Sequence, residues 1–231
     1  MGVTMVPQFV FSSLFVVMLV LSFQAAEKLP ERREVSVRRL PRVAIGLFTL
    51  VAVPSLLQFA YPGIYRALNR NWDLIQHHGQ WWRPFTSFMV QDGGVPGTAF
   101  NLFVLAIVAV AAERVWGSAT TLALFFGILA VFSIDTFLIA QPDGGGNSGV
   151  TFRLATTMAG LALVTLPGRR SVLLALGIAA DGVVCLALGN AHGEPMITGI
   201  VVGVLVALVQ RRRRAPQERC STEGVSSAGV R

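Results

Sequence analysis

The 231-residue sequence is poor in charge, cysteine and histidine, and each shortage excludes a class of protein. Only 13% of its residues are charged whereas 53% are hydrophobic, which argues against a soluble domain and is typical of a polytopic membrane protein. Cys185 lies in an apolar run and Cys220 in a polar tail, so no disulfide framework is expected. His77 and His78 stand together in a loop, where a histidine pair is more often solvated than metal-bound. We therefore predict neither a metal nor another cofactor.

The net charge of +7 reflects where the basic residues fall along the chain. They are grouped beside apolar runs, at Lys28 to Arg42, at Arg169 and Arg170, and at Arg211 to Arg214. The positive-inside rule accounts for such groups as signals of membrane orientation. The expected partner is therefore the lipid bilayer, and no nucleic acid is expected.

Seven apolar runs approach the length of about 20 residues that a helix needs to cross the hydrocarbon core. If the basic groups lie inside, the last run enters from outside, and the run that begins at Ser148 ends inside. Ser148 and His192 are then expected at the same, outer level of the membrane. The runs cover residues 5–23, 43–61, 97–116, 119–140, 148–166, 171–189 and 195–210.

These runs predict three parts of the chain. Residues 1–42 are expected to form an N-terminal transmembrane helix and a basic cytoplasmic linker, 43–210 a core of six helices, and 211–231 a basic, disordered cytoplasmic tail. The first run lacks preceding basic residues, which disfavours a signal peptide and leaves an added helix or a mis-assigned start codon. The long external stretch between the runs 43–61 and 97–116 carries three tryptophans and is expected to lie at the membrane interface.

The segment Gly146-Asn147-Ser148-Gly149 places a serine in a turn of small residues at the start of an apolar run. His192 stands at the head of a second run. A serine beside a histidine is the minimum needed for nucleophilic hydrolysis. Small residues let a substrate backbone approach closely, and a helix start offers free backbone N–H groups to a developing negative charge.

Four motifs in order resemble those of the rhomboid family of intramembrane serine proteases, over about residues 43 to 210. They are Trp82-Arg83 with Thr86, Asn101, Glu113 with Gly117, and Gly146 to Gly149. The resemblance implies an all-α polytopic membrane bundle, with a six-helix rhomboid-like core and an additional N-terminal transmembrane helix. It implies a Ser148–His192 dyad without an acid, and an oxyanion site formed by Asn101 and Gly149. Structural roles are implied for Trp82, Arg83, Thr86, Glu113, Gly117, Gly146, Gly199 and Gly203. Glu113 is expected to accept hydrogen bonds from a re-entrant loop. Gly199 and Gly203 are expected to pack on the Ser148 helix.

The sequence departs from the family pattern at three places. Gln91 and roughly Gly97 stand where the family has histidines, so one oxyanion contact is expected to be missing. Gly199 and Gly203 put Met196 at the family's histidine position, four residues after His192. Pro195 is tolerated in a first helical turn, which places His192 in a loop or cap. The third departure is an arginine, Arg153, within the nucleophile helix.

The function expected from these features is cleavage of transmembrane protein substrates near their outer ends, in a bacterial cytoplasmic membrane. The alternative is a catalytically inactive rhomboid-like protein that binds transmembrane helices, which Met196 facing the serine would favour. Asp135, Arg153 and Asp181 raise a third hypothesis, a small transporter, but we find no internal repeat. The two aspartates lack the Gly-x-Gly-Asp setting of aspartyl intramembrane proteases, and we expect Arg153 to pair with one of them.

Overall fold

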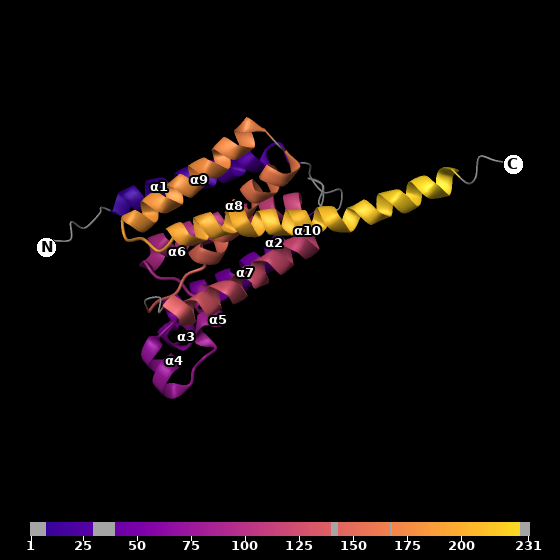
Figure 1. Ribbon diagram of the computed structural model, residues 1–231. Coiled ribbons are helices and arrows are strands. Elements are labelled where there is room, and N and C mark those ends of the chain that lie inside the picture. Colours follow the sequence, from indigo (N-terminus) through magenta and orange to yellow (C-terminus); the bar gives the residue numbers. More distant parts are fainter. Residues whose placement is uncertain (1–7, 30–39, 140–142, 167, 227–231) are drawn as a thin grey trace.

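The computed structural model describes residues 8–29, 40–139, 143–166 and 168–226 (Figure 1). Within these ranges the protein is all-helical, with one isolated backbone bridge, Arg70–Gly144, and no strand. The elements are α1 (Gln8–Ala26), α2 (Arg42–Ala60), α3 (Pro62–Leu68), α4 (Trp72–His78), α5 (Arg83–Thr86), the 3₁₀ turn η2 (Ser87–Met89), α6 (Gly94–Trp116), α7 (Ser118–Ile139), α8 (Ser148–Thr165), α9 (Arg169–Ala187) and α10 (Gly193–Ser226).

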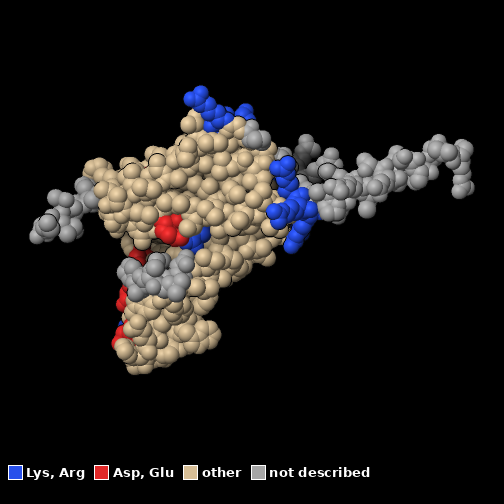
Figure 2. Space-filling model, viewed as in Figure 1, with Lys and Arg blue, Asp and Glu red and all other residues tan. Residues whose placement is uncertain are grey.

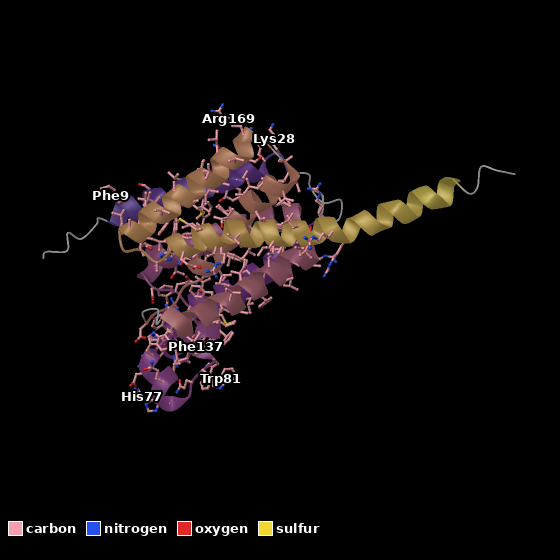
Figure 3. The ribbon with its side chains drawn as sticks, viewed as in Figure 1. Phe9, Lys28, His77, Trp81, Phe137 and Arg169 are labelled. Carbon is pink, nitrogen blue, oxygen red and sulfur yellow. The ribbon has the colours of Figure 1, made fainter. Side chains whose placement is uncertain are left out.

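Among the described residues, five helices are long and apolar enough to cross a membrane, judged by length and composition. They are α1, α2, α6, α9 and the Gly193–Arg213 part of α10, while α7 contributes a shorter apolar stretch, Ser118–Ile134. This arrangement confirms the prediction of a polytopic helical membrane bundle. The Lys and Arg side chains in view gather mainly at the top and the right of Figure 2, and Figure 3 places Lys28 and Arg169 together, away from Phe9.

Helix α8 occupies the centre of the bundle. Every residue from Gly149 to Ala162 is buried, and α1, α6, α7, α9 and α10 all contact the helix. A helix enclosed by protein needs no continuous apolar surface for lipid, which explains why α8 carries Arg153 and several threonines. The same enclosure explains why α8 is not one of the five clearly apolar spans.

Helices α8 and α10 pack with their backbones close together. A Cβ added to Gly199 would overlap the backbone of Arg153 and the side chain of Thr156, and one on Gly203 would overlap the backbone of Thr157. From the other side, Gly160 leaves room for the backbone of α10. The packing expected of the two α10 glycines is thus what the structure contains, because small residues allow helix backbones to approach.

The stretch between α2 and α6 folds into short helices that Arg83 and Thr86 hold together. Arg83 is buried, and its Nη1 donates to the carbonyl oxygens of Arg66 at 2.9 Å and Asn69 at 2.8 Å. Thr86 Oγ1 donates to Leu68 O at 3.0 Å. All three bonds satisfy carbonyls at or just after the end of α3, so this motif fastens α5 to α3. Trp82 is largely exposed.

Helix α10 extends beyond the predicted apolar run. Residues 211–231 were expected to form a disordered tail, and in the structure α10 continues as a helix to Ser226 (Figure 1). The run Arg211 to Arg214 consists of good helix formers, and it lets the helix continue beyond the apolar span. Residues 227–231 lie outside the described ranges.

Candidate functional site

The structure brings the side chains of Ser148 and His192 into hydrogen-bond contact. Ser148 is the first residue of α8, and His192 lies in the turn that precedes α10. Ser148 Oγ and His192 Nε2 are 2.8 Å apart. This distance is that expected for a serine nucleophile and its general base. The turn position also agrees with the loop or cap predicted for His192 from Pro195.

Asn190 orients the histidine, a role that the sequence reasoning missed. Its Oδ1 lies 2.7 Å from His192 Nδ1 and accepts the backbone N–H of His192 at 3.0 Å. The atom that accepts the backbone N–H is the amide oxygen of Asn190, and an amide oxygen cannot donate a hydrogen bond. The bond to the imidazole therefore needs a proton on Nδ1 of His192. The Nε2 lone pair therefore faces the Ser148 hydroxyl. The sequence did contain a signal for this role, because Asn190 stands two residues before His192 and an asparagine side chain often bonds the backbone N–H two residues on.

Two phenylalanines enclose the imidazole of His192. The ring centroid of Phe15, from α1, is 5.2 Å away, and that of Phe152, from α8, is 5.7 Å away. His192 precedes the apolar span of α10, and desolvation by burial lowers its pKa to about 4. A lowered pKa keeps the imidazole neutral at pH 7, the form that can accept a proton.

The start of α8 offers hydrogen-bond donors beside Ser148. The Thr151 N–H already bonds back to Asn147 O at 2.9 Å, which leaves the preceding N–H groups of Ser148, Gly149 and Val150 at the positive end of the helix dipole. A Cβ added to Gly149 would lie 2.8 Å from the ring of Phe132, so this position admits no side chain.

Asn101, on α6, faces the same space as Ser148. A Cβ added to Gly146 would lie 3.7 Å from Ser148 Oγ and 3.9 Å from Asn101 Nδ2, so a side chain there would stand between the two groups. Asn101 Nδ2 donates one hydrogen to Gln91 Oε1 at 2.9 Å. A primary amide has a second hydrogen to offer an acceptor beside Ser148.

Gln91 occupies one of the places where the family pattern has histidine, and it is built into the fold. Its backbone exchanges two hydrogen bonds with the side chain of Gln58 on α2: Gln91 N donates to Gln58 Oε1 at 3.0 Å, and Gln58 Nε2 donates to Gln91 O at 2.9 Å. Its own Nε2 donates to Ser55 Oγ at 3.2 Å. Gln91 therefore holds Asn101 in place, a contact that the departure from histidine did not predict.

These groups line a cavity of about 790 Å³. Ser148 and Asn101 face it from the core helices, His192 from the turn before α10, and Ser12 and Phe15 from α1. Its polar lining includes three charged residues of the outer loops, namely Arg70, Asp92 and Asp143. The cavity is large enough to admit water and part of a peptide chain.

The structure distinguishes the two residues that could face the serine, and it gives Arg153 a partner that was not expected. Met196 is fully buried in the hydrophobic core, and it is His192 that reaches the serine. Arg153 pairs with Glu194, with Nη2 at 2.5 Å from the carboxylate, whereas the Asp181 carboxylate makes no bond to it. The Asp135 side chain lies outside the described part. Glu194 lies in the first turn of α10, which the close α8–α10 packing places over Arg153.

Glu113 and Gly117 form a junction at the inner end of α6. Glu113 is buried and accepts the backbone N–H groups of Val43 at 3.2 Å and Ala44 at 2.7 Å, and the Ser118 hydroxyl at 2.8 Å. The carboxylate thus serves the start of α2, whose free N–H groups attract an anion, and not a re-entrant loop as expected. Gly117 ends α6 at φ 81°, which favours glycine.

Among the described residues, no group of three or more His, Cys, Asp or Glu side chains could hold a metal ion. The fold and this geometry define a polytopic helical membrane protein with a serine–histidine pair where α8 and α10 begin. No protein-family model matches the sequence. The chain is similar to Rhomboid protease GluP of Bacillus subtilis (strain 168), with 27% identity over 135 residues, or 56% of this chain. It spans 26% of that relative's length, and the similarity supports a rhomboid-like relation.

Proposed function

We propose that the protein is an intramembrane serine protease that cleaves transmembrane proteins near their outer ends. The observation that carries the proposal is the 2.8 Å contact between Ser148 Oγ and a neutral His192 at the head of a membrane helix. The similarity to a rhomboid protease supports the same reaction class. A bacterial cytoplasmic membrane is the proposed location.

In this proposal Ser148 Oγ attacks the peptide carbonyl carbon while His192 Nε2 takes the hydroxyl proton. The imidazolium that forms donates from Nδ1 to Asn190 Oδ1, and it then protonates the leaving amine. A water molecule, activated by His192, hydrolyses the acyl-enzyme. The oxyanion is stabilised by the Gly149 N–H and the second amide hydrogen of Asn101, and loss of one such donor typically slows the reaction by about 10²–10³.

The test is covalent labelling of the protein in detergent by a fluorophosphonate probe, which reports an activated serine without a known substrate. Ser148→Ala and His192→Ala should each abolish labelling. Ser13→Ala and His78→Ala are the matched controls, because both residues are exposed and neither lines the cavity that holds Ser148. Absence of labelling in a folded wild-type protein would refute the protease and favour a protein that only binds transmembrane helices.

A further inference from the structure

Helix α1 lies along the site and reaches the histidine. It runs beside α9 and against α8 (Figure 1), with Phe15, Met18, Leu19, Ser22 and Ala25 buried on one face. The spacing of these residues is that of a single helical face. Phe15 is 8% exposed and its ring lies on both His192 and Phe152, whereas the next residue, Val16, is 50% exposed on the opposite side.

We propose that the surface under α1 is the docking surface for the transmembrane helix of the substrate, and that α1 occupies it as a built-in competitor. We call this surface the α1 seat; it consists of Phe152 on α8 and Gly177 and Asp181 on α9, with His192 at its outer end. This inference rests on the proposed function and names where the substrate binds.

The shape of the α1 seat indicates an apolar helix as its occupant. Gly177 makes room for a helix, because a Cβ added there would lie 3.1 Å from Leu21 Cδ1 of α1. The outer turn of α1 contributes Ser12 and Phe15 to the wall of the cavity that holds Ser148. A helix in this position has its outer end beside the nucleophile, where a bond near the end of a span would be cut.

Asp181 gives the occupant a further chemical feature. The residue is 7% exposed, its carboxyl group stands beside the backbone of Met18, and neither oxygen bonds to a side chain. Burying such a group with so few partners costs free energy. The Met18 side chain carries no donor, so α1 leaves part of this cost unrelieved. A substrate helix with an aromatic residue at the Phe15 position and a hydroxyl at the Met18 position would fit the α1 seat better than α1 itself.

Displacement of α1 can be measured without any turnover. The probe is a synthetic peptide of residues 8–26 with benzoylphenylalanine in place of Phe15, cross-linked by light to the full-length protein in lipid nanodiscs. Phe15→Ala in the protein should raise labelling about tenfold, since a lost ring contact is worth about that factor. Val16→Ala is the matched control and should leave labelling unchanged. The cross-links should map to the segment around Phe152 and His192.

The opposite perturbation is a reversible disulfide that prevents displacement of α1. Leu21→Cys with Gly177→Cys, in a protein with Cys185→Ala and Cys220→Ser, should form a disulfide that holds α1 in place. Oxidation should abolish peptide labelling and reduction should restore it. Equal labelling of the locked and reduced forms, or cross-links only outside the α1 seat, would overturn the inference.

The hydroxyl preference adds a specific test. A peptide with Met18→Ser should compete roughly three- to tenfold better than the unchanged peptide, the range for a hydrogen bond between membrane helices. The preference should disappear in the protein with Asp181→Leu, and a preference that survives there would contradict the role of Asp181. Fluorophosphonate labelling of the same samples reports the proposed function separately, so either idea can fail alone.

Discussion

Substitution of Asn190 tests the proposed mechanism most directly. Its Oδ1 accepts two hydrogen bonds from His192, at 3.0 Å and 2.7 Å. The bond to Nδ1 becomes charge-assisted when the imidazolium forms, which makes it roughly twice as strong as a neutral bond of about 1 kcal/mol. Asn190→Ala should therefore lower the second-order rate of fluorophosphonate labelling by about 10- to 100-fold. The protein should remain folded, because Asn190 lies in a surface turn.

The pH dependence of labelling shows whether Asn190 orients His192 or only supports the fold. In the wild type, labelling should persist to acidic pH and fall only toward pH 4, where His192 becomes protonated. Asn190→Asp should restore much of the rate lost in Asn190→Ala. Its carboxylate favours the charged imidazole, so the acid limb should move to higher pH. A wild-type rate in Asn190→Ala, together with an unmoved acid limb in Asn190→Asp, would refute the assignment.

Three further predictions concern stability in detergent, measured by thermal unfolding. Glu113→Ala should lower the unfolding free energy by about 2–4 kcal/mol, since the N–H of Ala44 and its neighbour lose a buried acceptor, while Glu113→Gln should cost less. Gly199→Val should destabilise the protein by about 3 kcal/mol or more, because the added side chain would overlap the backbone of α8. A variant of unchanged stability would contradict the close packing of α8 and α10. Glu194→Ala should cost about 2 kcal/mol by removing a carboxylate that pairs with the buried Arg153, after allowance for the partial exposure of Glu194, whereas Arg153→Met with Glu194→Gln should recover most of that loss.

The sequence predicted the bundle because hydropathy and charge each constrain it independently. Runs of apolar residues located the helices, and the basic groups at Arg169 and Arg211 oriented them. Those two signals also predicted that Ser148 and His192 would share a membrane level. The contact between the Ser148 and His192 side chains could not be predicted in the same way. It depends on the backbone of the turn before α10, which Asn190 and Pro195 shape and which no hydrophobic periodicity describes.

The errors arose where a partner comes from a distant part of the chain. Arg153 was expected to pair with an aspartate within a membrane run, and the structure gives it a partner that was not expected, Glu194, at the start of the next core helix but one. Glu113 likewise serves backbone N–H groups about 70 residues away. Spacing within a motif carries no information about such partners, because helix–helix packing decides them.

The enclosed position of α8 has a consequence for how proteins of this kind are detected. A scan for apolar segments finds the helices whose surface faces lipid, and almost none of the α8 surface does. A topology count that omits this helix alone would reverse every helix after it and place Ser148 and His192 on opposite sides of the membrane. The span that is weakest by hydropathy is the one that carries the nucleophile, so in an unassigned membrane sequence that span is where a search for chemistry should begin.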